Sequence, residues 1–306
     1  MKILVTGGAG YIGTELIKNL SAQNETTQII VYDNLSRGNY NSFLGIDMPN
    51  GKKIEFVQGD ILDSRKLRKV LTDVDLVYHL AAKVTTPFGN TDPHFYEQIN
   101  HWGTAELVYA MEELEHIHLI HISSTSVYGS TDDIVDEASV LKPRTFYGIS
   151  KKRGEEHVMR LVDKGRATIV RCGNVFGYST SMRFDAVINK FAFESNFHNR
   201  IIIQGNGHQS RAFIHVDHLT AILARICQSK AIAGVFNLVA NNYEIIDLVD
   251  TFKQIIPSLE FIFVDQHLEL RNLRVNPQLI LSTVVDTSGG NELKDDIKVF
   301  LDKFSY

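Results

Sequence analysis

Short apolar runs and longer amphipathic stretches alternate along the first half of the chain. Six runs rich in β-branched and aromatic residues predict strands, at residues 2–6, 28–33, 53–60, 75–82, 117–124 and 167–175. The stretches between them show helical spacing, as in Ile12, Leu16 and Leu20, and a long one covers residues 94–114. Strands that are apolar throughout and alternate with helices are typical of a parallel sheet covered on both faces. The pattern therefore predicts an α/β protein with a doubly wound parallel sheet.

The pattern becomes irregular after residue 175. Strand-like runs at 200–205 and 234–239 are mixed there with amphipathic stretches at 217–228 and 246–256. We expect residues 1–175 to form the sheet domain. We expect residues 176–306 to form mainly a smaller α/β substrate-binding lobe, with some segments returning to the sheet domain.

Composition and charge narrow the classes of function. Of the 306 residues, 44% are hydrophobic and 22% are charged, and the formal net charge is −5. This balance is typical of a globular protein and argues against general binding to nucleic acid or to a membrane surface. The two cysteines, Cys172 and Cys227, predict no disulfide framework. Because no apolar run is long enough for a membrane span or a signal peptide, we expect a cytoplasmic protein.

A glycine-rich loop, VTGGAGYIG, follows the first predicted strand and opens the first predicted helix. Gly7, Gly10 and Gly13 allow a tight turn and bring backbone N–H groups close to a pyrophosphate at the helix N-terminus. Asp33 ends the second predicted strand, where a carboxylate binds ribose hydroxyls and repels a 2′-phosphate. These features predict a Rossmann-type NAD-binding domain. Two alternatives stay open: Asp33 is a turn residue, or the nearby Arg37 accepts the 2′-phosphate of NADP.

A tyrosine and a lysine lie one helical turn apart in the segment RTFYGISKKRG. Positions i and i+4 share one helix face, so Tyr147 and Lys151 can bring a phenol and an ammonium together. A surface pair is the simpler interpretation of this spacing alone. The fifth predicted strand ends in HISSTSVYG, at the sheet edge where open α/β folds bind ligands. Ser123 and Ser124 should therefore face the cofactor.

Several motifs together resemble those of the extended short-chain dehydrogenase/reductases, in particular their nucleotide-sugar epimerase branch. The motifs are TGGAGYIG, DNLSRG, GDILD, HLAA, SSTSVYG, YGISK, RCGNVFG and RAFIHVDHL, in the family's order and roughly its spacing. The resemblance covers most of the chain. It implies an NAD-dependent enzyme similar to UDP-glucose 4-epimerase that acts on a nucleotide sugar. It also implies a homodimer formed by the helix at 94–114 and the helix that follows Tyr147.

The resemblance implies roles for individual residues. Ser124, Tyr147 and Lys151 would be catalytic. The residues implied in NAD binding are Gly7, Gly10, Tyr11, Ile12, Gly13, Asp33, Asn34, Asp60, Ile61, Leu80, Ala81, Ala82, Lys83, Tyr147 and Lys151. Those implied in substrate binding are Thr85, Ser124, Tyr147, Asn174, Arg211 and Arg271. Arg274 is the alternative to Arg271, and Thr85 and Thr86 are either sugar contacts or loop residues.

The three catalytic candidates have the chemistry that hydride transfer needs. A tyrosine that acts as a base near pH 7 needs its pKa lowered by roughly three units, or about 4 kcal/mol. One ammonium about 4 Å away contributes on the order of 4 kcal/mol at an effective dielectric near 20, so Lys151 would suffice. Tyr147 would remove a hydroxyl proton, with Ser124 stabilising the developing charge, while hydride passes to the nicotinamide. Return of the hydride to the opposite face of the ketone inverts the carbon.

Departures from the family pattern favour epimerisation over dehydration. The 4,6-dehydratases of the family carry an Asp-Glu pair directly after the catalytic hydroxyl, where this chain has Thr125 and Ser126. Relatives that epimerise next to a ketone use a cysteine near the VYG motif, whereas Cys172 lies elsewhere and is expected to pack. We therefore expect C4 inversion of a UDP-hexose or a related sugar through a transient 4-keto intermediate.

Other functions stay open. An NAD-dependent reductase or dehydrogenase of a nucleotide sugar would use the same three residues, and a dinucleotide-sensing regulator would keep the fold without the chemistry. The histidines of the segment HIHLIHI do not share one strand face. We therefore expect no metal site.

Overall fold

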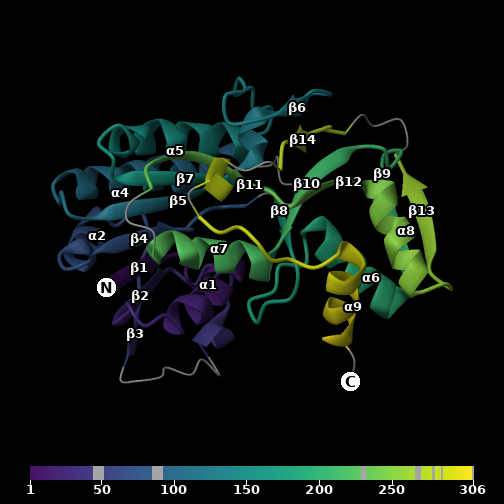
Figure 1. Cartoon of the computed structure of the whole chain (residues 1–306), viewed down its shortest axis with the longest axis horizontal. Helices are drawn as coiled ribbons and strands as arrows, with labels where there is room; N and C mark the ends of the chain where they lie inside the picture. Colours follow the sequence, from purple (N-terminus) through teal and green to yellow (C-terminus); the bar gives the residue numbers. More distant parts are fainter. Residues whose placement is uncertain are drawn as a thin grey trace.

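Seven parallel strands form the central sheet of the computed structural model (Figure 1). The structure describes residues 1–43, 52–84, 92–228, 232–265, 270–277, 280–283 and 285–304. The strands lie in the order β11-β7-β5-β4-β1-β2-β3. Their bounds are β1 Lys2–Thr6, β2 Gln28–Asp33, β3 Lys53–Gln58, β4 Leu76–His79, β5 His118–Ser124, β7 Ala167–Cys172 and β11 Gly234–Leu238. The order reverses between β1 and β4, so a ligand crevice is expected at the carboxyl ends of these strands.

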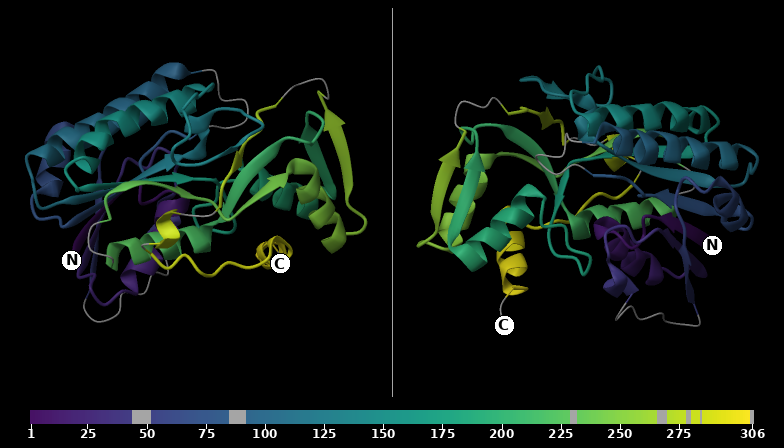
Figure 2. Two further views of the ribbon diagram at one scale, coloured as in Figure 1. Left: turned by 45° about the horizontal axis from the view of Figure 1, so that its top comes forward. Right: turned by 180° about the vertical axis from the view of Figure 1, so that it is seen from behind.

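Helices cover both faces of this sheet (Figures 1 and 2). One face carries α1 (Tyr11–Ser21) and α7 (Val216–Gln228), which pack side by side, and the other carries α2 (Ser64–Leu71), α4 (Gly103–Glu112) and α5 (Phe146–Val162). Because side chains alternate across a strand, Ile3 and Val5 pack toward α1 while Leu4 packs toward α2 and α4. The predicted doubly wound fold is confirmed.

The predicted strand at residues 167–175 is two strands. The chain breaks at Gly173: β7 stays in the central sheet, whereas β8 (Asn174–Phe176) pairs with β10 (Ser210–His215) in a separate sheet. A Cβ on Gly173 would lie 3.0 Å from the carbonyl oxygen of Ala212, so the glycine lets β10 pass close by. Apolar residues continue through the break, and for this reason periodicity did not reveal it.

The predicted helix at residues 94–114 contains a wider turn. It consists of α3 (Pro93–Tyr96), the π-helix η3 (Glu97–Trp102) and α4. A π turn adds a residue and changes which side chains share a face. The apolar Trp102 is 52% exposed, whereas the polar Asn100 is buried.

A smaller lobe is built mainly from residues after Gly173. It contains the sheet β8, β10 and β12 (Asn241–Glu244), and the parallel pair β9 (Arg200–Gln204) and β13 (Glu260–Val264). Its helices are α6 (Val187–His198), α8 (Ile245–Ile255) and α9 (Leu293–Asp302), and they enclose an apolar core of their own. The short elements are β6 (Ile134–Val135), which pairs with β14 (Arg274–Val275), and η1 (Tyr40–Phe43), η4 (Thr125–Tyr128) and η5 (Ile280–Thr283). Two segments from this part of the chain, β11 and α7, belong to the central sheet and its cover.

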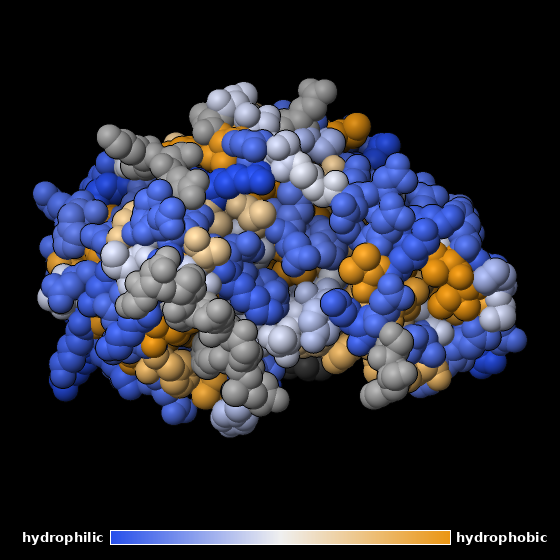
Figure 3. Space-filling view, turned by 60° about the horizontal axis from the view of Figure 1, so that its bottom comes forward, coloured by the Kyte–Doolittle hydropathy of each residue, from blue (hydrophilic) through white to orange (hydrophobic). Residues whose placement is uncertain are grey.

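Hydrophilic side chains dominate the face of the molecule in Figure 3, and hydrophobic ones form separate patches on it. The large apolar side chains pack inside: Tyr32, Tyr78 and Phe213 are among the largest that are fully buried. In the part of the chain that the structure describes, no helix has the length and apolar character needed to cross a membrane.

Candidate active site

The glycine-rich loop is tightly packed at the carboxyl end of β1. Gly7 has a φ of +70°, and a Cβ there would lie 2.5 Å from the backbone nitrogen of Ala81. A Cβ on Gly13 would lie 2.6 Å from the carbonyl oxygen of Gly7, so both positions need glycine. Gly10 caps α1 without a side chain, so the first backbone N–H groups of the helix can receive an anion. The loop therefore fits a dinucleotide pyrophosphate.

The Asp33 carboxylate, at the end of β2, holds this loop. It accepts the backbone N–H groups of Ala9 at 3.0 Å and Leu35 at 2.8 Å. Burial raises the pKa of Asp33, and these two hydrogen bonds oppose the rise. A carboxylate has about four acceptor positions, so ribose hydroxyls can still bind. The Arg37 guanidinium, considered above for NADP, lies 3.7 Å from the Asp185 carboxylate.

The residues implied in binding the adenine and lining the cleft follow β3 and β4. Asp60 accepts the side-chain amide of Asn34 at 2.9 Å, and Ile61 is buried. Three more follow β4 directly: Leu80, Ala81 and Ala82. Because the strands are parallel, their carboxyl ends meet at one edge of the sheet, and the structure brings these residues to the edge that carries the glycine-rich loop.

Three other predicted NAD residues have different surroundings. The Tyr11 hydroxyl donates to the carbonyl of Gly177 at 2.6 Å, and Ile12 packs against the core beneath α1. Lys83 is exposed, with its ammonium 5.7 Å from the centre of the Phe95 ring. The predicted contacts Thr85 and Thr86 lie outside the described residues.

The predicted catalytic residues converge at the carboxyl end of β5. Ser124 is the last residue of this strand, and Tyr147 and Lys151 lie in the first turns of α5, whose N-cap is Thr145. The Ser124 hydroxyl accepts the backbone N–H of Ser126 at 3.1 Å, and it is close enough to the Tyr147 phenol to lower its pKa. The buried Lys151 ammonium donates to the carbonyl of Ile122 at 2.6 Å, two residues before Ser124.

Burial dominates the pKa values of this group. It lowers the pKa of Lys151 to about 8, and the Glu155 carboxylate opposes this shift. Burial raises the pKa of Tyr147, whereas Arg183 and the nearby Ser124 hydroxyl lower it. The net shift of the Tyr147 pKa is therefore opposite to the one we expected from Lys151, because burial outweighs the nearby charges. The positive charge of an oxidised nicotinamide acts in the expected direction.

Two arginines reach this site from the smaller lobe. Arg211 lies on β10, and Arg271 lies between β13 and β14. Burial and the charge of Arg271 lower the pKa of Arg211 to about 9, and burial lowers the pKa of Arg271 while Tyr147 opposes it. None of the described carboxylates is among the groups that act on either guanidinium. Two desolvated like charges are costly unless an anion joins them, so this pair fits a diphosphate.

Asn174, the other predicted substrate residue from this lobe, begins β8. Its side-chain amide donates to the carbonyl of Ala212 at 2.9 Å. Ala212 directly follows Arg211 on β10, so Asn174 holds the strand that carries this arginine. Asn174 is thus linked to the strand of Arg211, while Arg271 acts on both Arg211 and Tyr147.

A buried ion pair joins the elements that carry the catalytic candidates, and sequence reasoning assigned it no role. Arg171 of β7 and Glu155 of α5 form an ion pair at 2.8 Å, with side-chain exposures of 6% and 4%. Glu155 also accepts the hydroxyl of Ser123. Since Ser123 precedes Ser124 and Glu155 lies one turn after Lys151, this pair ties α5 to the end of β5.

Asn100 is a further residue that sequence reasoning missed. Its side chain accepts the N–H of Lys83 at 2.8 Å and donates to the carbonyl of Lys83 at 2.9 Å and to the hydroxyl of Ser150 at 3.0 Å. It therefore joins the chain after β4 to α5. No local signal marks it, because only the π turn directs it inward.

Two histidines of the HIHLIHI segment have contacts within the protein. His118 lies 3.0 Å from the hydroxyl of Thr168, and His121 is buried against His79 with ring centres 5.2 Å apart. Within the described ranges, no three His, Cys, Asp or Glu side chains are grouped as a metal ion would need.

The model of the NAD dependent epimerase/dehydratase family matches residues 3–238. The chain belongs to this family. It is therefore an NAD-dependent enzyme, which confirms the resemblance seen in its motifs.

Relatives within the NAD dependent epimerase/dehydratase family include epimerases and dehydratases. A Methanocaldococcus jannaschii protein named "Putative UDP-glucose 4-epimerase" is 33% identical over 70% of this chain and 69% of its own length. The dTDP-D-glucose 4,6-dehydratase of Homo sapiens is 29% identical over 83% of this chain and 73% of its own length. The crystal structure of UDP-glucuronic acid 4-epimerase from Bacillus cereus, in complex with UDP-glucuronic acid and NAD, superposes with a TM-score of 0.84. That protein is 28% identical, and the match covers 99% of this chain and 98% of the other.

Proposed function

We propose that this enzyme inverts C4 of a UDP-hexose or a related nucleotide sugar through a 4-keto intermediate. One observation carries the proposal: Arg271 lies near enough to act both on the Tyr147 hydroxyl and on Arg211, and neither arginine has an acidic partner among the described residues. The hydroxyl provides an acid/base for a sugar, and the arginines provide a site for the diphosphate attached to it.

The residues of the chain have distinct roles in this reaction. Ser124 holds the C4 hydroxyl of the sugar, and Tyr147 takes its proton and later returns it. Lys151 keeps a positive charge near the site at pH values below its pKa of about 8. Arg211 and Arg271 hold the diphosphate while the sugar presents either face. NAD supplies the hydride acceptor and donor when bound.

Epimerisation is favoured over dehydration by the residues after Ser124. The family resemblance assigns the acid/base pair of the dehydratases to these positions, and Thr125 and Ser126 have no carboxyl group. Both side chains are buried in η4. The alternative is a reductase, which must release its cofactor after every turnover.

A uronic acid is a second candidate substrate. Arg183 lowers the pKa of Tyr147, so its positive charge acts at the reacting hydroxyl. Arg183 also pairs with Asp185, with nitrogen and oxygen 3.1 Å apart. A guanidinium at this point can bind the carboxylate of a UDP-hexuronic acid, the substrate class in the name of the Bacillus cereus enzyme.

NMR of the sugar in deuterated buffer tests the proposal, with UDP-glucose and UDP-glucuronic acid as substrates. We expect formation of the C4 epimer of one of them without added NADH and without solvent deuterium at C4. Tyr147→Phe should lower turnover at least 10²-fold, which is typical for loss of general acid–base catalysis. The matched control is Tyr109→Phe on α4, which removes only a hydroxyl that lies 3.5 Å from His157 of α5. Stoichiometric use of NADH with a reduced sugar as product would favour the reductase, and normal turnover of Tyr147→Phe would exclude this tyrosine as the base.

We further propose a homodimer in which α4 and α5 of two chains pack together, as the family resemblance implies. Trp102, which is exposed just before α4 and stacks on His101 with ring centres 4.7 Å apart, supports a contact face there. Light scattering should give the mass of a dimer, and Trp102→Glu should give that of a monomer.

Residues 1–175 would mainly bind NAD, and residues 176–306 would mainly bind the sugar. The two free cysteines support action in the cytoplasm.

A further inference from the structure

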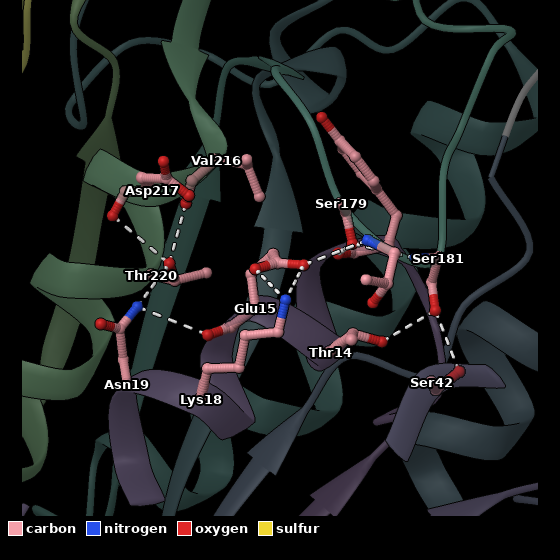
Figure 4. Close-up of polar contacts among 12 residues, drawn as sticks. Thr14, Glu15, Lys18, Asn19, Ser42, Ser179, Ser181, Val216, Asp217 and Thr220 are labelled. Carbon is pink, nitrogen blue, oxygen red and sulfur yellow. Dashed lines mark hydrogen bonds and ion pairs between the residues drawn. The ribbon is translucent and has the colours of Figure 1, made fainter. Parts of the chain in front are cut away.

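A segment of the smaller lobe reaches the glycine-rich loop. Residues 177–185, here called the clasp, connect β8 to the residues before α6. Figure 4 shows the clasp serines pointing toward α1 and toward Ser42. The Ser181 hydroxyl lies 2.9 Å from that of Thr14 and 2.9 Å from that of Ser42, and the Ser179 hydroxyl donates to the carbonyl of Tyr11 at 3.1 Å.

These contacts hold the loop in addition to its hydrogen bond with Asp33. The Ser42 hydroxyl shares its proton between the carbonyls of Asn39 at 2.6 Å and Ala9 at 3.0 Å, while the N–H of Ala9 donates to Asp33 at 3.0 Å. The peptide groups on both sides of Ala9 are thus fixed between η1 and β2, and Ser181 fixes Ser42 in turn. The glycine-rich loop cannot widen unless these bonds break.

The clasp has its own anchors at both ends. The Asn189 side chain accepts the N–H of Gly177 at 2.9 Å and donates to the carbonyl of Arg183 at 2.9 Å. It also donates to the Tyr11 hydroxyl at 3.2 Å. This single buried amide therefore fixes the clasp and its contact with α1 together.

The three hydroxyls at the centre are almost completely buried. Thr14 is 0% exposed, and Ser42 and Ser181 are each 1% exposed. A buried hydroxyl is costly unless it is hydrogen-bonded, so the three groups specify one arrangement of clasp, α1 and η1. Each end of the arrangement lies next to a predicted NAD contact: Thr14 next to Gly13, and Ala9 next to Gly10.

We propose that the clasp is a positioning element for NAD, with Ser181 as its central residue, and that it slows release of the dinucleotide. A loop already fixed in its binding shape loses less freedom when NAD binds and opens less often afterwards. The benefit rests on the proposed function, because an epimerase takes back the hydride that it removed and has no need to exchange its cofactor.

The test is the rate at which NAD bound to the full-length protein exchanges with excess isotopically labelled NAD, followed by mass spectrometry. We expect Ser181→Ala and Ser42→Ala each to raise the rate about tenfold, in line with the loss of one or two buried hydrogen bonds. The double variant should exceed the faster single variant by less than about threefold, because both changes remove the same contact.

The matched control is Ser195→Ala. Ser195 is also buried in the smaller lobe, but its hydroxyl donates to the carbonyl of Ala192 within α6. We expect its exchange rate to stay within about twofold of the unmodified protein. A folded Ser181→Ala protein that exchanges NAD at the rate of this control would overturn the proposal and leave the clasp a structural feature only.

Asp185→Asn covers the case in which the serine variants do not fold. This change keeps the shape of the side chain and weakens two ion pairs, the one with Arg37 at 3.7 Å and the one within the clasp with Arg183 at 3.1 Å. We expect about threefold faster exchange, and an unchanged rate would overturn the proposal. No sugar is present in these experiments, so their outcome is independent of whether the enzyme is an epimerase.

Discussion

Two clusters near the predicted catalytic residues contain arginines, Arg171 with Glu155 and Arg211 with Arg271, and they differ in how their charge is compensated. Burial lowers the pKa of Arg171, but the hydrogen bonds and charge of Glu155 more than offset this, so the net shift is upward. The pKa of Arg211 moves downward, because burial and the charge of Arg271 act in the same direction. The charge of Arg171 is neutralised by a carboxylate of the protein itself. The like charges of Arg211 and Arg271 need an anion that a ligand can supply.

The largest effect is expected from breaking the compensated cluster. Glu155→Gln leaves Arg171 as a buried charge without a counter-charge, and should lower the free energy of unfolding by about 3–5 kcal/mol. Urea denaturation measures this. The control is Glu113→Gln, which breaks the exposed pair with Arg68 and should cost less than about 1 kcal/mol. Equal losses in the two variants would mean that the buried pair contributes no more than a surface one.

Lys151 sharpens the comparison, because it is a buried cation that donates to a carbonyl and not to the nearby Glu155 carboxylate. Its pKa falls from the ordinary 10.5 to about 8 on folding. The unfolded chain therefore binds more protons between these pH values, so the cost of burying Lys151 is complete below pH 8 and disappears as the pH rises toward 10.5.

Lys151→Met should accordingly stabilise the protein by about 3 kcal/mol at pH 7 while abolishing activity. The gain should shrink when unfolding is measured at pH 9.5. Lys152→Met is the control, because this neighbouring side chain is partly exposed and pairs with Glu156. A gain that does not change with pH would show that folding does not lower the pKa of Lys151, so that its ammonium stays charged in the folded protein at pH 9.5.

A smaller effect, on binding and not on folding, is expected from Arg211→Met. Removal of one of two like charges should leave stability unchanged or raised, and should weaken UDP binding about 10- to 100-fold, as expected for hydrogen bonds to a charged group. Calorimetry with UDP measures this. The control is Arg274→Met, because Arg274 is the exposed alternative to Arg271. This variant should bind UDP with unchanged affinity. If Arg211→Met loses as much stability as Glu155→Gln, the distinction between the two clusters is wrong.

The smallest effect is expected from a change at the Asp33 carboxylate. In the described part of the chain, the Asp33 carboxylate accepts two backbone N–H groups and has no cationic partner. Asp33→Ala should narrow the preference for NAD over NADP about tenfold, because it removes the acceptor of the ribose hydroxyls and the repulsion of a 2′-phosphate. Titration with both cofactors measures this, with Asp63→Ala at the N-cap of α2 as the control. Equal affinities in the unmodified protein would assign the 2′-phosphate to Arg37.

The sequence by itself determined the features that depend on neighbouring residues. The glycine-rich loop needs only the positive φ of Gly7 and the close packing of Gly13, and both follow from a short strand–turn–helix segment. Tyr147 and Lys151 share a face because α5 is a helix. The alternation of apolar strands and amphipathic helices was sufficient to predict a doubly wound sheet, since each element must bury one face or both.

Tertiary structure alone decided how distant segments meet. Arg211 and Arg271 lie 60 positions apart in the chain. The residues next to them in the sequence do not reveal that the two guanidinium groups meet without a carboxylate partner. Ser181 contacts Thr14, which is 167 positions away in the sequence, and the sequence of the clasp predicts only a loop. Asn100 turns inward only because a π turn shifts the helix face, and the chain leaves the central sheet at Gly173 only because β10 passes there. Periodicity records whether a residue is buried, but which charges and hydroxyls share that burial depends on the packing of the whole chain.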